Sequence, residues 1–284
     1  MASKLQLSRR IKTAQNISKT TKAMQMIAAS KLKKAQEAAL SSRTYVEKLM
    51  SVTSSLTKRV EEATLPAYMK ETKSTNKTLY IVVAPDKGLC GGLVTNLAKE
   101  VLKQSSSSDS FLTIGKKIES PIARMTKNVI AAFPFGNILP KYDVVYPIAK
   151  IIDEQYLTGK VDKVVLISTH FVNLFIQKAT VTQLLPIVPQ VEDTTVSKAA
   201  DAFQLFEPDL ESLLSELLKR YMEMTLYQEL LESYLSEQSA RMLSMQNATN
   251  NAKEIIEDLK LEYNKTRQAK ITSELLDITG GLTA

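Results

Sequence analysis

The feature that most constrains this chain is a stretch of about 70 residues, Asp209 to Thr279, that contains neither glycine nor proline. Apolar side chains recur there alternately every four and three residues from Leu210 to Tyr263, and the repeat is broken only by Gln228, Gln238, Thr249 and its last position, Thr266. A repeat of 3.5 residues predicts a helix that supercoils left-handedly against a partner helix. Such a helix is on the order of 100 Å long, more than one globular domain needs. Pro208 and Gly280–Gly281 flank the stretch and predict where it begins and ends.

The first sixty residues follow the same spacing. Their repeat runs from Leu7 to Leu56, with small side chains (Ala, Ser, Thr) in its middle and larger ones at its ends. Small residues let two helix axes approach closely, and Met242, Met245 and Ile256 offer larger counterparts in the last stretch. We therefore expect the first and last helices to pair with each other, antiparallel, rather than each with a second copy of the chain.

The middle of the chain has a different composition, because all nine prolines and six of the eight glycines lie between positions 66 and 208. Its apolar runs predict strands at 78–84, 111–114, 129–133, 163–169, 173–179 and 181–187, and helices at 93–104, 116–127 and 144–157. This alternation predicts a small parallel α/β sheet of Rossmann type with an antiparallel extension. The predicted fold is α/β plus a long α-helical coiled coil: an N-terminal coiled-coil helix (1–65), an inserted Rossmann-like α/β domain (66–208) and a C-terminal coiled-coil helix (209–284).

Charge is distributed unevenly. Residues 1–60 carry nine Lys and four Arg against two Glu, a net of +11, which leaves −4 for the rest of the chain. So basic a segment indicates nucleic acid, an anionic membrane surface or acidic protein loops as a partner, or else a solvated helix face, and composition does not choose among them. No apolar run reaches the roughly 18 residues of a membrane span. Because the basic start continues into the helical repeat, we interpret it as mature structure and not as a transit peptide.

Candidate catalytic and binding residues are few. The glycine-rich loop Asp86–Gly92 follows a predicted strand and precedes a predicted helix, where an α/β protein could bind phosphate. Its spacing matches neither the dinucleotide fingerprint nor the Walker loop, so we favour a structural turn. Cys90 at a helix start could be a nucleophile, but no histidine lies nearby in sequence, and we favour a structural thiol. The single histidine, His170, follows an apolar run and reads as a strand-end residue. We expect no catalytic, cofactor or metal site.

Polar residues interrupt the long C-terminal helix in two places. Asn247, Thr249, Asn250 and Asn251 form one group, and Asn264, Thr266, Arg267 and Gln268 form the other. Asn and Thr are weak helix formers, so something must offset their cost. They either relieve the packing of the seam or form hydrogen bonds to a partner around the helix, and the sequence leaves both interpretations open.

Three motif blocks resemble the gamma subunit of the rotary F-type ATP synthase, over nearly the whole chain. The first is RRIKTAQNISKTTKAMQMIAASKLKKAQ (9–36), which is similar to the opening helix of that family. The second is DKGLCGGL (86–93), with Lys87 where Arg is usual. The third comprises LFEPD (205–209), SEQSARMLSMQNATNNA (236–252) and YNKTRQAKITSELLDITGG (263–281).

The resemblance implies a central rotor shaft that couples proton flow through the membrane sector to ATP synthesis and hydrolysis. The paired helices would lie inside a ring of alpha and beta subunits. The α/β domain would form a foot on the c-subunit membrane ring, beside an epsilon (delta-type) stalk subunit. The chain itself would have no catalytic residues and no cofactor, and it would bind no nucleic acid. Its place would be the cytoplasmic side of the bacterial inner membrane, or alternatively the matrix side of the mitochondrial inner membrane.

The resemblance also implies roles for particular residues. Arg267 and Gln268 align with a pair that contacts a beta-subunit loop, and Met24, Lys22 and Cys90 align with positions near the beta subunit. Phe203 and Phe206 should lie near the membrane-ring end.

The chain departs from the family pattern at several positions. Pro85 stands where Ser or Thr is usual and would stiffen the turn. Val94 and Thr95 replace the commoner Asn-Thr/Ser pair, which puts a polar contact there in doubt. A single cysteine excludes the dithiol switch of the chloroplast form.

Two rival functions remain at this point. A basic coiled-coil protein that binds nucleic acid would do so with a steep salt dependence. A nucleotide-dependent α/β enzyme would bind phosphate on the loop Gly88–Gly92.

Overall fold

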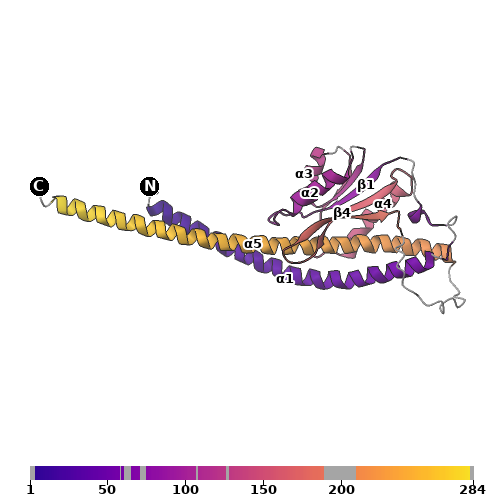
Figure 1. The fold of residues 1–284 in the computed structure, drawn as a ribbon, viewed down its shortest axis with the longest axis horizontal. Coiled ribbons are helices and arrows are strands. Elements are labelled where there is room, and N and C mark those ends of the chain that lie inside the picture. The colour runs from indigo at the N-terminus through magenta and orange to yellow at the C-terminus, as the bar shows by residue number, and fades with distance from the viewer. Residues whose placement is uncertain are drawn as a thin grey trace. The chain divides into compact units, whose positions relative to one another are not determined.

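The structure is a computed structural model that describes residues 4–57, 59–60, 65–70, 75–106, 108–125, 128–188 and 209–281, without the side chains of 277–281. Two long helices begin and end the described chain, α1 (Lys4–Thr57) and α5 (Leu210–Gly281) (Figure 1). Both were predicted within a few residues. The predicted end before Gly280 was wrong, because α5 continues to Gly281. A glycine costs a helix about 1 kcal/mol relative to alanine but does not end it by itself.

Contacts divide the chain into two compact units. Unit 1 comprises Met1–Ser30 and Arg241–Ala284, and unit 2 comprises Lys31–Ala240. In unit 1 the Lys4 ammonium lies 5.8 Å from the centre of the Tyr263 ring, and the hydroxyls of Thr21 and Thr249 are 2.7 Å apart. The partners of α1 in unit 1 therefore occur in reverse order along α5.

The predicted seam positions of both helices are withdrawn from solvent. From Leu7 to Leu56 on α1, and from Leu210 to Thr266 on α5, every position of the 3.5-residue repeat is buried or half-buried, including the polar Gln228, Gln238 and Thr249. The repeat thus identified the inward faces of both helices.

Unit 2 contains a five-stranded sheet. Its strands are β1 (Thr78–Val83), β2 (Ser110–Ile114), β3 (Val129–Phe133), β4 (Lys163–Phe171) and β5 (Gln177–Leu185), in the order β3-β2-β1-β4-β5. The first four are mutually parallel, and β5 is antiparallel to β4. Three α-helices connect them, namely α2 (Leu93–Gln104), α3 (Lys116–Met125) and α4 (Val145–Tyr156), with short 3₁₀ turns η2 (Ala67–Met69) and η3 (Tyr142–Val144).

One part of the predicted sheet was wrong. The sequence indicated two strands, 173–179 and 181–187, but the structure has one, β5, which begins at Gln177. The side-chain oxygen of Asn173 accepts the N–H groups of Phe175 and Ile176, at 2.9 and 2.8 Å, and so makes a turn of these apolar residues. Side chain to backbone bonds of this kind compete with strand pairing. Without a break near Thr180, the segment continues as a single strand paired with β4.

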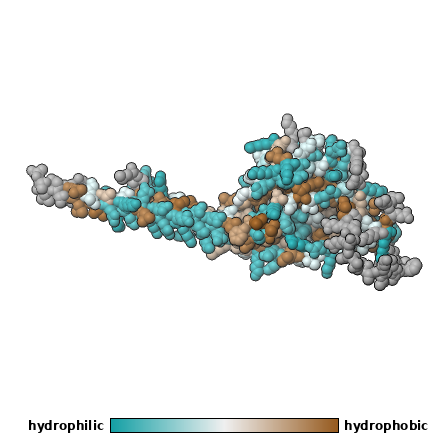
Figure 2. Space-filling view, viewed as in Figure 1, coloured by the Kyte–Doolittle hydropathy of each residue, from teal (hydrophilic) through white to brown (hydrophobic). Residues whose placement is uncertain are grey.

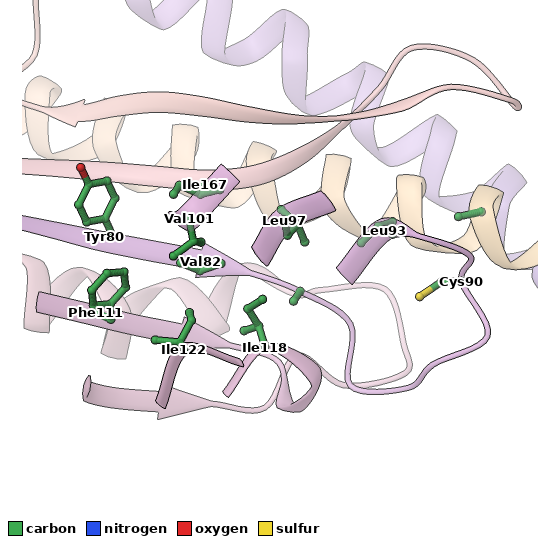
Figure 3. Close-up of a cluster of buried hydrophobic side chains, with 12 residues drawn as sticks. Tyr80, Val82, Cys90, Leu93, Leu97, Val101, Phe111, Ile118, Ile122 and Ile167 are labelled. Atoms are coloured by element: carbon green, nitrogen blue, oxygen red, sulfur yellow. The ribbon is translucent and has the colours of Figure 1, made fainter. Parts of the chain in front are cut away.

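Helices α2 and α3 cover one face of the sheet. Tyr80 and Val82 of β1 and Ile167 of β4 point into a buried cluster with side chains of both helices (Figure 3). Tyr80 stacks on Phe111 of β2 with ring centres 5.5 Å apart. Because successive strand residues point to opposite faces, Leu79 and Ile81 are buried on the other face.

That second face is covered by α4 and by the middle of α5. Ser168 of β4 donates its hydroxyl to Glu229 of α5 at 2.6 Å, and the Lys219 ammonium of α5 lies 3.4 Å from Asp153 of α4. From Leu230 to Ala240, every residue of α5 is buried. In unit 2 this part of α5 therefore belongs to the buried core and does not lie on the surface.

Candidate interaction surfaces

The C-terminal part of α5 presents its side chains to solvent. Arg267 and Gln268 are both exposed. Apolar side chains nearby are also exposed, including Leu261 at 61% and Ile271 at 47%. In Figure 2, hydrophilic side chains cover much of the visible face of the unit 1 helices, and hydrophobic patches interrupt them toward the C-terminal end. A helix face that mixes a guanidinium, an amide and large apolar side chains can bind another protein by polar and apolar contacts together.

The N-terminal helix places a second group of predicted site residues in the same unit. Lys22 is exposed, with its ammonium 3.3 Å from the side-chain oxygen of Gln25, and Met24 is 40% exposed. Lys31, by contrast, belongs to unit 2, where its ammonium donates to the carbonyl of Asn137 at 2.6 Å. Both lysines lie on the basic helix α1, but Lys31 is engaged within the chain.

The polar group at residues 247–251 divides into two parts. Thr249 is 4% exposed, and its hydroxyl bonds to the Met245 carbonyl at 2.8 Å as well as to the Thr21 hydroxyl. Asn247, Asn250 and Asn251 are exposed. Thr249 thus belongs to internal packing, and the three asparagines are accessible to a partner.

The glycine-rich loop is organised by Asp86. Its carboxylate accepts the backbone N–H groups of Lys116, Gly136 and Phe135, at 2.9, 2.8 and 3.2 Å. Burial acts to raise the pKa of Asp86, but these three bonds outweigh it, so the pKa lies below 3.8. The side chain that opens the loop therefore ties neighbouring loops together, and this contact favours the structural turn.

Cys90 lies inside the protein. It is 3% exposed, its sulfur is 3.9 Å from the Lys87 carbonyl oxygen, and it belongs to the same buried cluster as Leu93 and Ala240 (Figure 3). Lys87 and Leu89 of the same loop are exposed. Leu89 is 62% exposed and has a positive φ of 64°. A thiol surrounded by apolar side chains is a packing residue, as expected from the sequence.

His170 lies near the end of β4, as predicted, and takes part in a charged cluster that sequence reasoning missed. Glu232 of α5 is only 2% exposed and pairs with Arg43 of α1, and its second oxygen is 3.6 Å from Nδ1 of His170. Burial raises the pKa of the neighbouring Glu229, against the hydrogen bond from Ser168.

A second polar group joins η3 to α5. The Tyr142 hydroxyl donates to Glu223 at 2.6 Å and accepts from Arg220 at 2.6 Å. The signal for both groups was the recurrence of glutamates at positions 223, 229 and 232, close to apolar residues of the same helix such as Leu226 and Leu230.

Two predicted site residues, Phe203 and Phe206, lie outside the described residues. Within the described part of the chain, no helix is long and apolar enough to cross a bilayer.

Comparison with known proteins places this geometry in a family. Residues 3–284 match the ATP synthase family. The "ATP synthase gamma chain" of Dehalococcoides mccartyi is 39% identical over 281 residues, covering 98% of this chain and 97% of the relative. That of Polynucleobacter asymbioticus is 40% identical over 294 residues and covers both chains fully. Among solved structures, a chain from the central stalk and c-ring of the Tetrahymena thermophila mitochondrial ATP synthase has a TM-score of 0.61 and 28% identity, covering 81% of this chain and 99% of that one. The chain therefore belongs to the ATP synthase gamma chain family.

Proposed function

We propose that this chain is the central rotor shaft of an F-type ATP synthase, which couples proton flow through the membrane sector to ATP synthesis and hydrolysis by rotation. The observation that carries this conclusion is the match over nearly the whole length to gamma chains, including both long helices and the sheet domain between them. The chain acts without catalytic residues of its own. In support, its only cysteine is buried among apolar side chains.

The architecture that suits this role is an antiparallel coiled coil with an inserted Rossmann-like domain. The reversed order of the unit 1 contacts and the burial of the seam positions support the coiled coil. Four parallel strands in the order β3-β2-β1-β4 support the Rossmann-like arrangement. In this description the chain divides into segments 1–65 and 209–284, which contain the coiled-coil helices α1 and α5, and segment 66–208, which forms the foot.

The shaft contacts the beta subunits through unit 1. Arg267 and Gln268 on α5 bind a beta-subunit loop, and Lys22 and Met24 on α1 face an acidic beta-subunit segment. This assignment is supported by the exposure of all four side chains and by the net +11 of residues 1–60. In the loop around Cys90 the thiol is buried, so the exposed Lys87 and Leu89 are the side chains that a beta subunit would meet.

The foot end completes the assembly. It carries an epsilon (delta-type) subunit and rests on the c-subunit ring, with Phe203 and Phe206 toward the ring. The chain is a peripheral membrane protein on the cytoplasmic side of a bacterial membrane, which agrees with its bacterial relatives. The alpha and beta subunits form the ring around its helices.

Rotation of the shaft shifts the populations of the conformations of each beta subunit. Each orientation of an asymmetric shaft contacts one conformation of a beta subunit better than the others, and only this difference in contact free energy can favour one nucleotide-binding state. An arginine fork and a side-chain amide suit contacts that form and break in each turn, because both offer several donors to different acceptors.

The test is purification of the tagged chain from detergent-solubilised membranes, followed by sizing and an assay of azide-sensitive ATP hydrolysis. A large complex with that activity and two different larger subunits is expected. A small assembly that carries nucleic acid and hydrolyses no ATP would refute the proposal.

A further inference from the structure

A single buried carboxylate in unit 2 joins both long helices to the sheet. Glu232 lies in the fully buried part of α5. Its Oε1 accepts from the Arg43 guanidinium of α1 and, at 3.2 Å, from the Gln228 amide of α5. Its Oε2 accepts from the backbone N–H of Phe171 in β4 at 3.4 Å and lies 3.6 Å from Nδ1 of His170. We call these five residues the Glu232 cluster.

The cluster satisfies the carboxylate and has little tolerance for change. Two carboxylate oxygens offer about four acceptor positions, and four groups approach them here. A glutamine of the same shape has one acceptor oxygen and one NH₂ group. In either orientation its NH₂ would face a donor, the Phe171 N–H on one side or the Arg43 and Gln228 groups on the other. Removing one member of a buried ion pair is strongly destabilising, so the Glu232 carboxylate depends on the Arg43 guanidinium.

Directional bonds at this place matter for a rotating shaft. The hydrophobic effect, which packs the helices on the sheet, is itself non-directional. Charge-assisted hydrogen bonds fix both distance and angle. We propose that Glu232 is a positioning residue that holds α1 and α5 in a fixed orientation on β4. Rotation of the sheet domain then turns the helix pair through the same angle. This inference rests on the proposed rotor function.

The experiment measures the torsional stiffness of the assembled complex. The alpha–beta ring is fixed to a surface, and a probe is attached to the foot through Lys103→Cys, at a side chain that is 73% exposed. The variance of the probe angle in the nucleotide-arrested state gives the stiffness. For Glu232→Gln the variance is expected to rise roughly twofold or more, because a hydrogen bond to a charged group is among the stronger directional links. Hydrogen exchange at the Phe171 amide should rise on the order of tenfold.

The matched control is Asp162→Asn. Asp162 is also a buried carboxylate that accepts backbone N–H groups, from Thr75 at 3.0 Å and Asn76 at 2.6 Å, and these contacts lie within the sheet domain. It should lower thermal stability comparably and leave the variance unchanged. If Glu232→Gln does not assemble, Arg43→Met tests the same link at a half-exposed position, and Arg43→Lys should restore part of the stiffness because it keeps the charge.

The outcomes separate the two proposals. If the wild-type complex rotates and Glu232→Gln and Arg43→Met keep the wild-type variance, the positioning role of Glu232 is refuted and the rotor function stands. If the wild-type chain forms no rotating complex, the rotor function itself fails.

Discussion

Gly115 offers a sharp test of how the sheet and its loops fit together. It lies between the end of β2 and the start of α3, with φ +102°, and an added Cβ would lie 1.8 Å from the Ala84 carbonyl oxygen and 2.7 Å from its carbon. Relief requires the backbone to move. That movement breaks bonds that hold this corner, from the Gly115 N–H to the Phe133 carbonyl at 2.7 Å and from the Ala84 N–H to the Ile114 carbonyl at 2.8 Å.

The magnitude for Gly115→Ala follows from separate terms. The positive φ costs an alanine roughly 1–2 kcal/mol. Two weakened hydrogen bonds cost about 1 kcal/mol each, and the displaced backbone costs roughly 1–3 kcal/mol more. Gly136→Ala is the matched control, because Gly136 also has a positive φ, +85°, and nothing lies within 4 Å of its added Cβ. The two variants therefore share the first term, and Gly115→Ala should be less stable than the control by roughly 3–5 kcal/mol.

The assay is urea or thermal unfolding of the full chain. Unfolding is monitored by the near-ultraviolet circular dichroism of tyrosine, since the chain has no tryptophan. At about 2–4 °C per kcal/mol for a protein of this size class, the difference between the variants is easily resolved. Equal stability of Gly115→Ala and Gly136→Ala would refute the clash and the tight corner inferred from it.

Other predictions concern the shaft and the buried acids. Replacing both Arg267 and Gln268 by alanine should lower ATP turnover of the assembled complex on the order of tenfold, about 1.4 kcal/mol, and leave the circular dichroism of the free chain unchanged; wild-type turnover and proton pumping would argue against the contact. The raised pKa of Glu229 means that the folded chain binds more protons than the unfolded chain above pH 4.5, so stability should fall as pH rises from there. Glu229→Gln should remove part of that fall in unfolding curves between pH 5 and pH 8, and an unchanged pH profile would contradict the assignment. Thr249→Val should cost about 1 kcal/mol and Thr21→Val less, but the double variant should cost less than their sum, because both partners of one bond are removed together; additive losses in a double-mutant cycle would show that the hydroxyls do not interact.

Most of the helical part of this fold could be predicted from the sequence. A strict 3.5-residue repeat identified the inward faces of α1 and α5, because burying one stripe per helix dominates over local propensity. The repeat predicted burial correctly even at polar positions, because Gln228 and Thr249 lie at seam positions and are buried. Three of the four parallel strands, β1, β2 and β4, were found because they are short apolar runs that are largely buried on both faces.

What the sequence could not supply was contacts between distant segments. No local sequence pattern indicates that Glu232 pairs with Arg43 of the first helix, or that Asp86 accepts the N–H of Gly136. Each bond joins residues far apart in the chain. The apolar turn at Phe175 and Ile176 was misread for a related reason: one asparagine side chain outcompetes strand pairing there, and its geometry is not visible in the composition. The exposure of Arg267 and Gln268 agrees with the roles implied by the resemblance, and a beta subunit is needed to test them.

The buried middle of α5 also bears on how the chain is made. Leu230–Ala240 forms part of the core of unit 2, yet ribosomes produce it after every strand of the sheet. Until that segment emerges, the face of β4 that carries Ser168 has no helix α5 to cover it. At roughly 5–20 residues per second a ribosome needs several seconds to pass from the end of β5 to Ala240. A nascent sheet with an uncovered apolar face is a substrate for chaperones, and folding of this domain must wait until α5 has been synthesised as far as Ala240.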